Sequence, residues 1–368
     1  MNLSQKLDTL TAPGELYEKL DDNALRCTAC GHRCLIREGK RGICQVRFNE
    51  GGELRVPFGY VAALQADPIE KKPFYHFLSG EKALSFGMLG CDLHCDYCQN
   101  WFTSQALRDP ASERAGRLVR EVSAKDLVEL AKQNGAKIIA STYNEPLITS
   151  EWAVAVFKEA KQAGLKTAFV SNGHATPEVL AYLAPHLDGY KIDLKSMQAK
   201  NYRQLGGTLQ HVLDSIKLAK ELDLWVEVVT LVVPGFNDSN EELWEAANFL
   251  ARVSPDIPWH VTAYHKDYKM TENENTPLDT LIRAAELGRE AGLRYVYAGN
   301  VHGRAGEYES TFCPSCQRPV IERIGFSLRR YKLTAEGTCP HCNTAVAGIW
   351  NENVDAVNLN GGGMPKLV

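Results

Sequence analysis

Short apolar runs alternate with amphipathic stretches through the middle of the chain, roughly residues 81–300. The stretches repeat their apolar positions about every three to four residues, which is the period of a helix, whereas the runs have the length of buried strands. This alternation predicts parallel βαβ units. Strands are expected at residues 83–88, 137–142, 166–171, 189–194, 225–232, 260–263 and 295–298, and helices at 124–133, 151–163, 213–222, 240–253 and 278–291.

The number of these units favours an α/β fold, and among α/β folds it favours a partial TIM-type barrel with about six parallel βα units. Such barrels place their chemistry at the carboxyl ends of the strands, so site residues are expected there. The pattern changes on both sides of the barrel, which predicts four segments. They are a Cys-rich N-terminal extension (1–80), the barrel (81–300), a zinc-ribbon-like metal-binding module (301–350) and a tail (351–368).

Charge and hydropathy narrow the class of protein. The 41 Lys and Arg residues against 45 Asp and Glu give a net charge of −4, which argues against a general binder of nucleic acid or anionic membranes. No apolar run approaches the roughly 20 residues that a membrane span requires, and the first residues are polar, unlike a signal segment. We therefore expect a cytoplasmic protein without nucleic acid or membrane as a partner.

Eleven cysteines fall into three tight groups. The N-terminal group is Cys27, Cys30, Cys34 and Cys44, the central group is Cys91, Cys95 and Cys98, and the C-terminal group is Cys313, Cys316, Cys339 and Cys342. In a reducing cytoplasm, clustered thiols indicate metal or cluster ligands before disulfides. The three groups account for every cysteine of the chain, so the composition alone predicts metal chemistry.

The central group has the spacing C-x3-C-x2-C and follows directly on the first expected strand. Three thiolates on one short loop can hold three corners of a cubane iron–sulfur cluster, whereas most ferredoxin-type clusters have four. The fourth iron then keeps an open position that can chelate a substrate or cofactor. The alternative is a structural zinc ion with His94 or another residue as fourth ligand, which this spacing after a strand disfavours.

The central motif resembles that of the radical S-adenosylmethionine (SAM) superfamily. It reads Cys91-Asp-Leu-His-Cys95-Asp-Tyr97-Cys98. The resemblance implies a 4Fe–4S cluster on the three catalytic cysteines, SAM chelated at the open iron, and Tyr97 packed on the SAM adenine. In that superfamily an electron from the cluster cleaves SAM to methionine and a 5′-deoxyadenosyl radical, which abstracts a hydrogen atom from the substrate.

The second expected strand runs into Ser-Thr-Tyr-Asn-Glu-Pro, residues 141–146. Radical SAM enzymes usually have a glycine/glutamate motif at this place, whose residues bind the SAM amino group. The resemblance therefore implies that Glu145 binds SAM. Tyr143 and Asn144 replace the glycines here, so the backbone contacts of the family motif are not carried over.

The third and fourth expected strands end in further polar residues. Ser171 and Asn172 follow the third strand, and Asp193 and Lys195 follow the fourth. Both segments resemble parts of glycyl-radical-enzyme activases that approach SAM, and there the lysine pairs with the SAM carboxylate, as simple electrostatics favours. The alternative for Asp193 and Lys195 is a strand-end turn with solvated charges. Val170 stands where the activases have an aspartate, so no metal-cation site is carried over.

His260 lies on the sixth expected strand, where alternation places it on one face with Thr262 and Tyr264. It is predicted to contact SAM or the substrate, with a packed, hydrogen-bonded histidine as the alternative. Lys71 and Lys72 precede the barrel in a Glu-Lys-Lys-Pro run. A solvated charge run is the default interpretation of these lysines, and binding of an anionic substrate is the alternative.

The chain resembles one family over roughly residues 25–350, the AmmeMemoRadiSam system radical SAM enzymes, which are related to pyruvate formate-lyase activating enzymes. The motifs that carry this resemblance are residues 67–77, 99–101, 143–146, 258–260, 264–265, 268–270, 297–300 and 348–350. The resemblance implies AMMECR1-type and Memo-type proteins as partners and an electron donor such as flavodoxin or ferredoxin. It defines no substrate.

The two flanking cysteine groups have the spacing of metal sites. In the C-terminal group two C-x2-C pairs flank residues 317–338, so four thiolates can close a tetrahedron around one structural zinc ion. An auxiliary iron–sulfur cluster is the less favoured alternative there. The N-terminal group, C-x2-C-x3-C-x9-C, fits zinc and an auxiliary cluster equally, with His32 as a further candidate ligand.

The sequence thus predicts an enzyme that cleaves SAM reductively and abstracts hydrogen from an unidentified substrate, with a small molecule favoured. One alternative is an activase that acts on a partner protein, and another is a metal-stabilised interaction scaffold without catalysis. A protein substrate predicts a wide, open barrel mouth, whereas a small molecule predicts a capped pocket.

Overall fold

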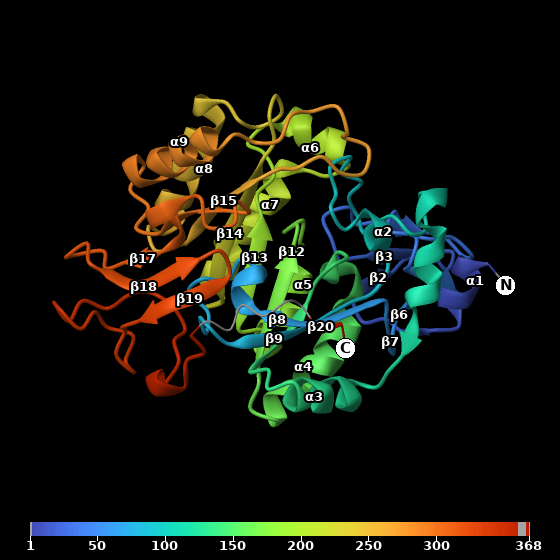
Figure 1. Ribbon diagram of the computed structural model, residues 1–368. Helices are drawn as coiled ribbons and strands as arrows, with labels where there is room; N and C mark the ends of the chain where they lie inside the picture. The colour runs from blue at the N-terminus through green and yellow to red at the C-terminus, as the bar shows by residue number, and fades with distance from the viewer. Residues whose placement is uncertain (1, 360–365, 368) are drawn as a thin grey trace.

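The computed structural model describes residues 2–359, 366 and 367, and its centre is a nine-stranded sheet of order β16-β15-β14-β13-β12-β11-β9-β8-β20 (Figure 1). Seven of these strands, from β16 to β9 in the sheet order, run parallel to one another. They are β9 (Lys82–Gly87), β11 (Ile138–Ser141), β12 (Lys166–Ser171), β13 (Gly189–Asp193), β14 (Trp225–Val232), β15 (Trp259–Ala263) and β16 (Val296–Gly299). The expected α/β fold with a mainly parallel sheet is confirmed, and every expected strand is present.

Helices connect these strands. They are α3 (Ala124–Gln133), α4 (Ser150–Gln162), α5 (Pro177–Leu183), α6 (Ala199–Leu205), α7 (Leu209–Glu221), α8 (Asn240–Val253) and α9 (Leu278–Glu290). Of these helices, α3, α4, α7 and α9 pack against the sheet. Helix α3 begins where Ser123 accepts a hydrogen bond from the backbone N–H of Asp126 in a capping box. The two short helices α5 and α6 were not expected, because seven residues give too few apolar positions to show a period.

The N-terminal extension contributes directly to the central sheet. Its strand β8 (Ala63–Pro68) pairs antiparallel with β9, and β20 (Lys366–Leu367) pairs antiparallel with β8. The remaining N-terminal elements are α1 (Leu3–Asp8), β1 (Thr11–Pro13), β2 (Tyr17–Lys19), β3 (Leu25–Cys27), β4 (Leu35–Ile36), β5 (Phe48–Glu50), β6 (Glu53–Pro57), β7 (Tyr60–Val61) and the 3-10 turn η1 (Ile69–Lys71). β7 pairs with β10 (Arg120–Glu121).

The C-terminal module is a three-stranded antiparallel sheet of β17 (Thr311–Phe312), β18 (Pro319–Ile324) and β19 (Ser327–Tyr331). Figure 1 shows it on the opposite side of the central sheet from the N-terminal extension. Buried Arg323 joins the module to the segment before β9 by donating to the carbonyl oxygen of Tyr75 at 2.8 Å and to Ser79 Oγ at 2.9 Å. Residues 360–365 and 368 of the expected tail lie outside the described residues.

Short helical segments complete the loops. They are α2 (Trp101–Ser104), η2 (Pro110–Leu118), η3 (Pro146–Thr149), η4 (Ala184–His186), η5 (Gly306–Glu309) and η6 (Val354–Ala356). Within the described part of the chain, no helix is long and apolar enough to cross a membrane.

Candidate active site

The three central cysteines lie on the loop after β9, at the carboxyl edge of the parallel sheet. They line one cavity of about 150 Å³ together with Glu145 and Asn172, here called the cluster cavity. The loop can pass this close because β9 ends in Gly87, where a Cβ atom would lie 2.4 Å from the carbonyl oxygen of Thr142. A glycine is therefore required at the point where β9 meets the turn after β11.

The spacing of the central sulfurs suits a cluster better than a zinc ion. Tetrahedral zinc with Zn–S bonds of about 2.3 Å holds its sulfurs about 3.8 Å apart. Among the described residues, the sets of ligating atoms that lie within 4.8 Å of one another do not include the central group or His94. Burial raises the pKa of Cys95 to about 12 and also raises the pKa of Cys91. These thiols therefore ionise to thiolates near neutral pH only when a positively charged metal centre binds them. The residues present fit an iron–sulfur cluster.

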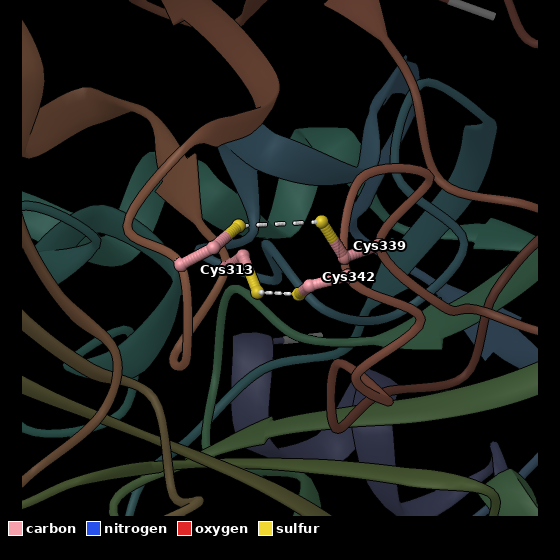
Figure 2. A group of neighbouring side chains, drawn as sticks. Cys313, Cys339 and Cys342 are labelled. Carbon is pink, nitrogen blue, oxygen red and sulfur yellow. Dashed lines mark hydrogen bonds between the residues drawn. The ribbon is translucent and has the colours of Figure 1, made fainter.

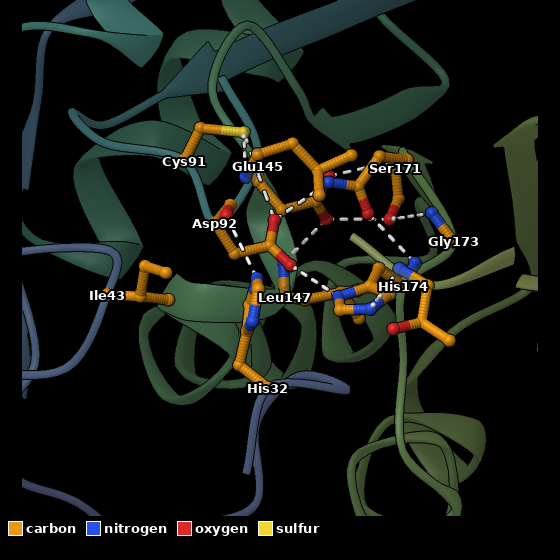
Figure 3. Close-up of polar contacts among 12 residues, drawn as sticks. His32, Ile43, Cys91, Asp92, Glu145, Leu147, Ser171, Gly173 and His174 are labelled. Carbon is orange, nitrogen blue, oxygen red and sulfur yellow. Dashed lines mark hydrogen bonds and ion pairs between the residues drawn. The ribbon is translucent and has the colours of Figure 1, made fainter. Parts of the chain in front are cut away.

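Glu145, Ser171 and Asn172 meet beside the central cysteines, as predicted for strand ends of one sheet. Glu145 Oε1 accepts a hydrogen bond from Ser171 Oγ at 2.6 Å, and its Oε2 accepts one from the backbone N–H of Asn172 at 2.7 Å (Figure 3). Burial, together with the charge of Asp92, raises the pKa of Glu145 to about 8. The three residues form one wall of the cluster cavity.

Asp92 and His174 are buried site residues that sequence reasoning missed. Asp92 accepts a hydrogen bond from Asn172 Nδ2 at 2.7 Å, and its other oxygen lies 2.9 Å from His174 Nδ1 (Figure 3). His174 Nε2 accepts the backbone N–H of Thr208, so the proton of this imidazole lies on Nδ1 and points at Asp92. The signal in the sequence was a carboxylate between the first two central cysteines and a histidine two positions after Asn172.

The N-terminal group lies against this buried pair. The ligating atoms of Cys30, Asp92 and His174 lie within 4.8 Å of one another, whereas the four cysteines of the N-terminal group do not form such a compact set among the described residues. His32 Nε2 lies 3.1 Å from the carbonyl oxygen of Asp92. The N-terminal group therefore borders the central loop, and its predicted metal stays a prediction.

Tyr97, Asp193 and Lys195 share a second cavity, of about 200 Å³, that opens beside Cys95 and Cys98. This cavity is called the Tyr97 cleft. Lys195 Nζ lies 3.1 Å from Asp193 Oδ2, and Lys191 forms an ion pair with the same carboxylate. Burial would raise the pKa of Asp193, but the two lysines hold it at about 2. These charges are paired inside the site, unlike those of a solvated strand-end turn.

A third cavity, of about 320 Å³, adjoins the Tyr97 cleft and is called the lysine chamber. Its walls include Lys71, Lys72, Tyr143, Lys191, His260 and Phe326. The lysine chamber and the Tyr97 cleft share the side chains of Gln99, Asn100, Val229, Leu231 and Thr262. A molecule in the chamber would therefore lie next to a molecule in the cleft.

His260 lines the lysine chamber and not the Tyr97 cleft. Its Nε2 lies 2.7 Å from Glu227 Oε2, and its ring packs against Tyr75 and Tyr297. Burial lowers the pKa of His260. The packed, hydrogen-bonded histidine weighed in the sequence describes this environment, and contact of His260 with a cofactor stays a prediction.

The C-terminal group is compact where the central group is not. Cys313 Sγ lies 3.4 Å from Cys342 Sγ, and Cys316 Sγ lies 3.7 Å from Cys339 Sγ. Figure 2 shows Cys313, Cys339 and Cys342 converging from the two C-x2-C loops. Sulfur separations of this size match the edge of a zinc–thiolate tetrahedron, about 3.8 Å. The predicted four-cysteine module is present, and the identity of its metal is a separate question.

Comparison with known proteins agrees with the central motif. The family model described as Radical SAM superfamily matches residues 87–250. An uncharacterized protein of Methanocaldococcus jannaschii is 38% identical over 344 residues, which cover 93% of this chain and 98% of that protein.

Two groups of activating enzymes are also similar. An isethionate sulfite-lyase activating enzyme of Desulfovibrio desulfuricans is 27% identical over 172 residues, covering 46% of this chain and 54% of that protein. A pyruvate formate-lyase-activating enzyme of Clostridium pasteurianum is 24% identical over 200 residues, covering 50% of this chain and 81% of that protein. A crystal structure of a domain of pyruvate-formate lyase-activating enzyme from Bacteroides vulgatus aligns with a TM-score of 0.39 at 20% identity, covering 44% of this chain and 98% of that one.

The AmmeMemoRadiSam resemblance and the AMMECR1-type and Memo-type partners stay predictions. The family match, the relatives and the three-cysteine cavity agree on the superfamily. The chain belongs to the radical SAM superfamily and is an enzyme of the type related to pyruvate formate-lyase activating enzymes.

Proposed function

We propose that this enzyme cleaves SAM at a 4Fe–4S cluster held by Cys91, Cys95 and Cys98, and that its substrate is a small molecule in the lysine chamber. The observation that carries the small-molecule proposal is the position of the chamber, which adjoins the Tyr97 cleft and is bordered by Phe326 of the C-terminal module. Cluster and SAM together would supply a 5′-deoxyadenosyl radical when bound and reduced.

The residues of the Tyr97 cleft would bind and orient SAM. Lys195 can pair with the carboxylate of SAM because Asp193 already shares its charge between two lysines. Burial opposes a charge on Lys195, but Asp193 and Cys95 raise its pKa well above that of a free lysine, so it stays a cation. Glu145 can accept from the SAM amino group, and Tyr97 lies edge-on to Phe236 in the wall where an adenine would pack.

The lysine chamber favours a small molecule over a partner protein. Phe326 lies at the turn between β18 and β19, so the C-terminal module forms part of the chamber wall. A chamber narrowed in this way limits the access of water to a radical reaction and suits a small molecule better than a protein loop. Flavodoxin or ferredoxin is the proposed electron donor, and the proposed location is the cytoplasm.

A second candidate is the activation of a partner protein, which the activating-enzyme relatives favour. In that case a flexible segment of the partner would enter the lysine chamber. The two candidates predict different results when an extract of small molecules is tested for hydrogen transfer with the enzyme. A low-molecular-mass fraction that takes deuterium or supplies hydrogen supports the first, whereas transfer confined to a protein fraction supports the second.

For the flanking groups we propose structural zinc in the C-terminal group and either zinc or an auxiliary iron–sulfur cluster in the N-terminal group. The sulfur separations of 3.4 and 3.7 Å support zinc in the C-terminal group. The N-terminal group, with Cys30 beside Asp92 and His174, offers a mixed set of donors that favours neither metal.

The test of the proposed function uses full-length protein purified and reconstituted without oxygen, then reduced in the presence of SAM. We expect 5′-deoxyadenosine and methionine from the wild type and none from Cys95→Ala. Transfer of deuterium from a labelled metabolite pool into 5′-deoxyadenosine would then identify the substrate fraction. A fully loaded, reducible cluster that yields no 5′-deoxyadenosine with any fraction would refute the proposal.

A further inference from the structure

Two aspartates of the site, Asp67 and Asp193, each face two lysines. In the Tyr97 cleft, Asp193 pairs with Lys191 and Lys195. At the lysine chamber, which Lys71 and Lys72 line, Asp67 Oδ2 lies 2.8 Å from Lys72 Nζ, and Asp67 Oδ1 lies 3.3 Å from Lys71 Nζ. One carboxylate cannot neutralise two ammonium groups, so each set carries one surplus positive charge.

The proposed function gives a partner to only one of these sets. The carboxylate of SAM would balance the surplus charge beside Asp193. SAM bound in the Tyr97 cleft would not balance the surplus charge of Lys71 and Lys72. These two lysines line the chamber assigned to the substrate. The other carboxylates near the chamber have basic partners of their own: Glu70 Oε1 lies 3.8 Å from Arg323 Nε, and Glu227 Oε2 lies 2.7 Å from His260 Nε2.

The two chamber lysines are held in different ways. Lys72 is only 5% exposed, and its Nζ donates to Asp67 and to Tyr143 Oη, both at 2.8 Å. These contacts use two of the three N–H groups of an ammonium and leave one. Lys71 is 30% exposed, and its Nζ lies 3.5 Å from Gln65 Oε1, so its contacts are long and its ammonium can reorient.

Tyr143 is held in an unusual backbone conformation beside these lysines. Its φ angle is +71°, a region that side-chain-bearing residues rarely adopt. Thr103 Oγ1 donates to its carbonyl oxygen at 3.0 Å, and its ring centroid lies 4.5 Å from Lys72 Nζ. Backbone strain of this kind concentrates at functional sites, and here it brings a phenol to the chamber lysines.

The chamber continues into a second, largely apolar cavity of about 300 Å³. The two cavities share Lys71, Tyr75 and Phe326, and the second is also lined by Pro68 and Ile324. Val229 and Leu231 line the opposite part of the chamber, where it meets the Tyr97 cleft. Apolar walls therefore flank the pair of lysines.

We propose that the substrate is an organic anion, with a carboxylate or phosphate monoester bound by Lys71 and Lys72 and an apolar body along the chamber. The statement that this anion is the substrate rests on the proposed function, whereas the statement that the chamber binds such an anion does not. The apolar body would extend toward Val229 and Leu231, next to the place where SAM is cleaved.

The test measures binding of four probes of equal length to reconstituted full-length protein in the absence of oxygen. Hexanoate and hexyl phosphate carry an anionic head, whereas 1-hexanol is neutral and hexylamine is cationic. By isothermal titration calorimetry we expect at least one of the two anions to bind tenfold or more tightly than either control probe. Lys71→Met and Lys72→Met should each weaken binding of that anion fivefold or more and leave binding of 1-hexanol unchanged.

Lys200→Met on the exposed face of α6 is the matched control and should bind the anion as the wild type does. Equal affinity for hexanoate, hexyl phosphate and 1-hexanol, or binding of none of the probes, would overturn the inference. If Lys72→Met does not fold, then Lys71→Met and Lys72→Arg still test it, since only the former should lose affinity.

Anion binding tests this inference, whereas formation of 5′-deoxyadenosine tests the proposed function, so the two can fail separately. Anion binding without formation of 5′-deoxyadenosine would defeat the proposed function alone. SAM cleavage in a protein that binds neither anion would defeat the inference alone.

Discussion

The central and C-terminal cysteine groups use the same donor atom in opposite ways. The C-terminal group supplies four sulfurs, paired at 3.4 and 3.7 Å, on loops of a small sheet whose buried core also includes Tyr75, Tyr295 and Tyr297. The central group supplies three sulfurs, more widely spaced, on the wall of a cavity. Donor number and spacing therefore distinguish a closed site that stabilises a fold from an open site that can bind a reactant.

The side chains around the two cysteine groups also differ: they are mainly polar around the central group and mainly apolar around the C-terminal group. Around the central cysteines lie buried acids, amides and lysines, including Glu145, Asn172, Asp193 and Lys195, in cavities large enough for ligands. The side chains packed in the C-terminal group's core include Val320, Leu328 and Val346. An open metal site requires polar groups to position what binds there, whereas a closed site requires only packing.

Removal of the central cysteines is expected to have the largest effect. The triple variant Cys91→Ala, Cys95→Ala, Cys98→Ala should lose the iron of the catalytic cluster and all formation of 5′-deoxyadenosine. It should retain at least one equivalent of zinc, because the C-terminal group shares no ligand with the central loop. Metal analysis after anaerobic reconstitution, with product quantification, measures both effects.

This experiment also decides the metals of the flanking groups. Iron that disappears completely would leave zinc at the C-terminal group and no auxiliary cluster at the N-terminal group. Stoichiometric iron retained by the triple variant would show that a flanking group holds a cluster, and the contrast between open and closed sites would then rest on ligand number alone.

Cys339→Ser should break the closed site and leave the open one loaded. Structural zinc typically contributes on the order of 10 kcal/mol or more to the folding of small metal modules, so its loss should unfold much of the C-terminal sheet. We expect one equivalent less zinc and rapid proteolysis within residues 301–350, with the iron content unchanged. Resistance to proteolysis equal to that of the wild type would contradict a structural role for this metal.

The sequence predicted the mainly parallel α/β fold correctly and brought the proposed cluster ligands together in one motif, because both depend on local order. Strand β14 and the motif from Cys91 to Cys98 each lie in one short segment, so hydrophobic periodicity and ligand spacing determine them. The link between Asp92 and His174 was beyond reach, because it joins two loops about 80 positions apart that only the sheet brings together. The lysine chamber was missed for the same reason.

The position of Lys191 beside Asp193 could have been predicted from the sequence. It stands two residues before Asp193 on β13, so strand alternation places both side chains on one face. The prediction for Lys195 paired it with the SAM carboxylate. It named neither the ion pair of Lys195 with Asp193 nor the second lysine that shares this carboxylate. The charge balance of the site follows only when all three residues are placed together.

Lys195→Met should weaken SAM binding without loss of the cluster. A hydrogen bond to a charged group contributes about 1.5–3 kcal/mol, which corresponds to roughly a 10- to 150-fold higher KM for SAM. Asp193 keeps Lys191 as its partner in this variant, so the cleft should remain folded. Lys200→Met serves as control, and an unchanged KM for SAM in Lys195→Met would refute the proposed role.

The smallest expected effect is a pH dependence on the substrate side of the open site. Burial lowers the pKa of Lys72 to about 8, although Asp67 opposes this shift. Lys72 is therefore charged below pH 8 and loses its proton as the pH rises through that value, whereas a carboxylate probe stays ionised. Hexanoate affinity should fall severalfold between pH 7 and 9 in the wild type.

The other charged groups that face Lys72 are Asp67, Lys71, Tyr143 and Lys191. Burial raises the pKa of Tyr143 far above this range, so its phenol does not ionise between pH 7 and 9. In Lys72→Arg the guanidinium remains charged, and the pH dependence should disappear. An equal decline in Lys72→Arg would assign the titration to another group and remove Lys72 from the anion site, leaving Lys71 as the cation that the lysine chamber offers a substrate.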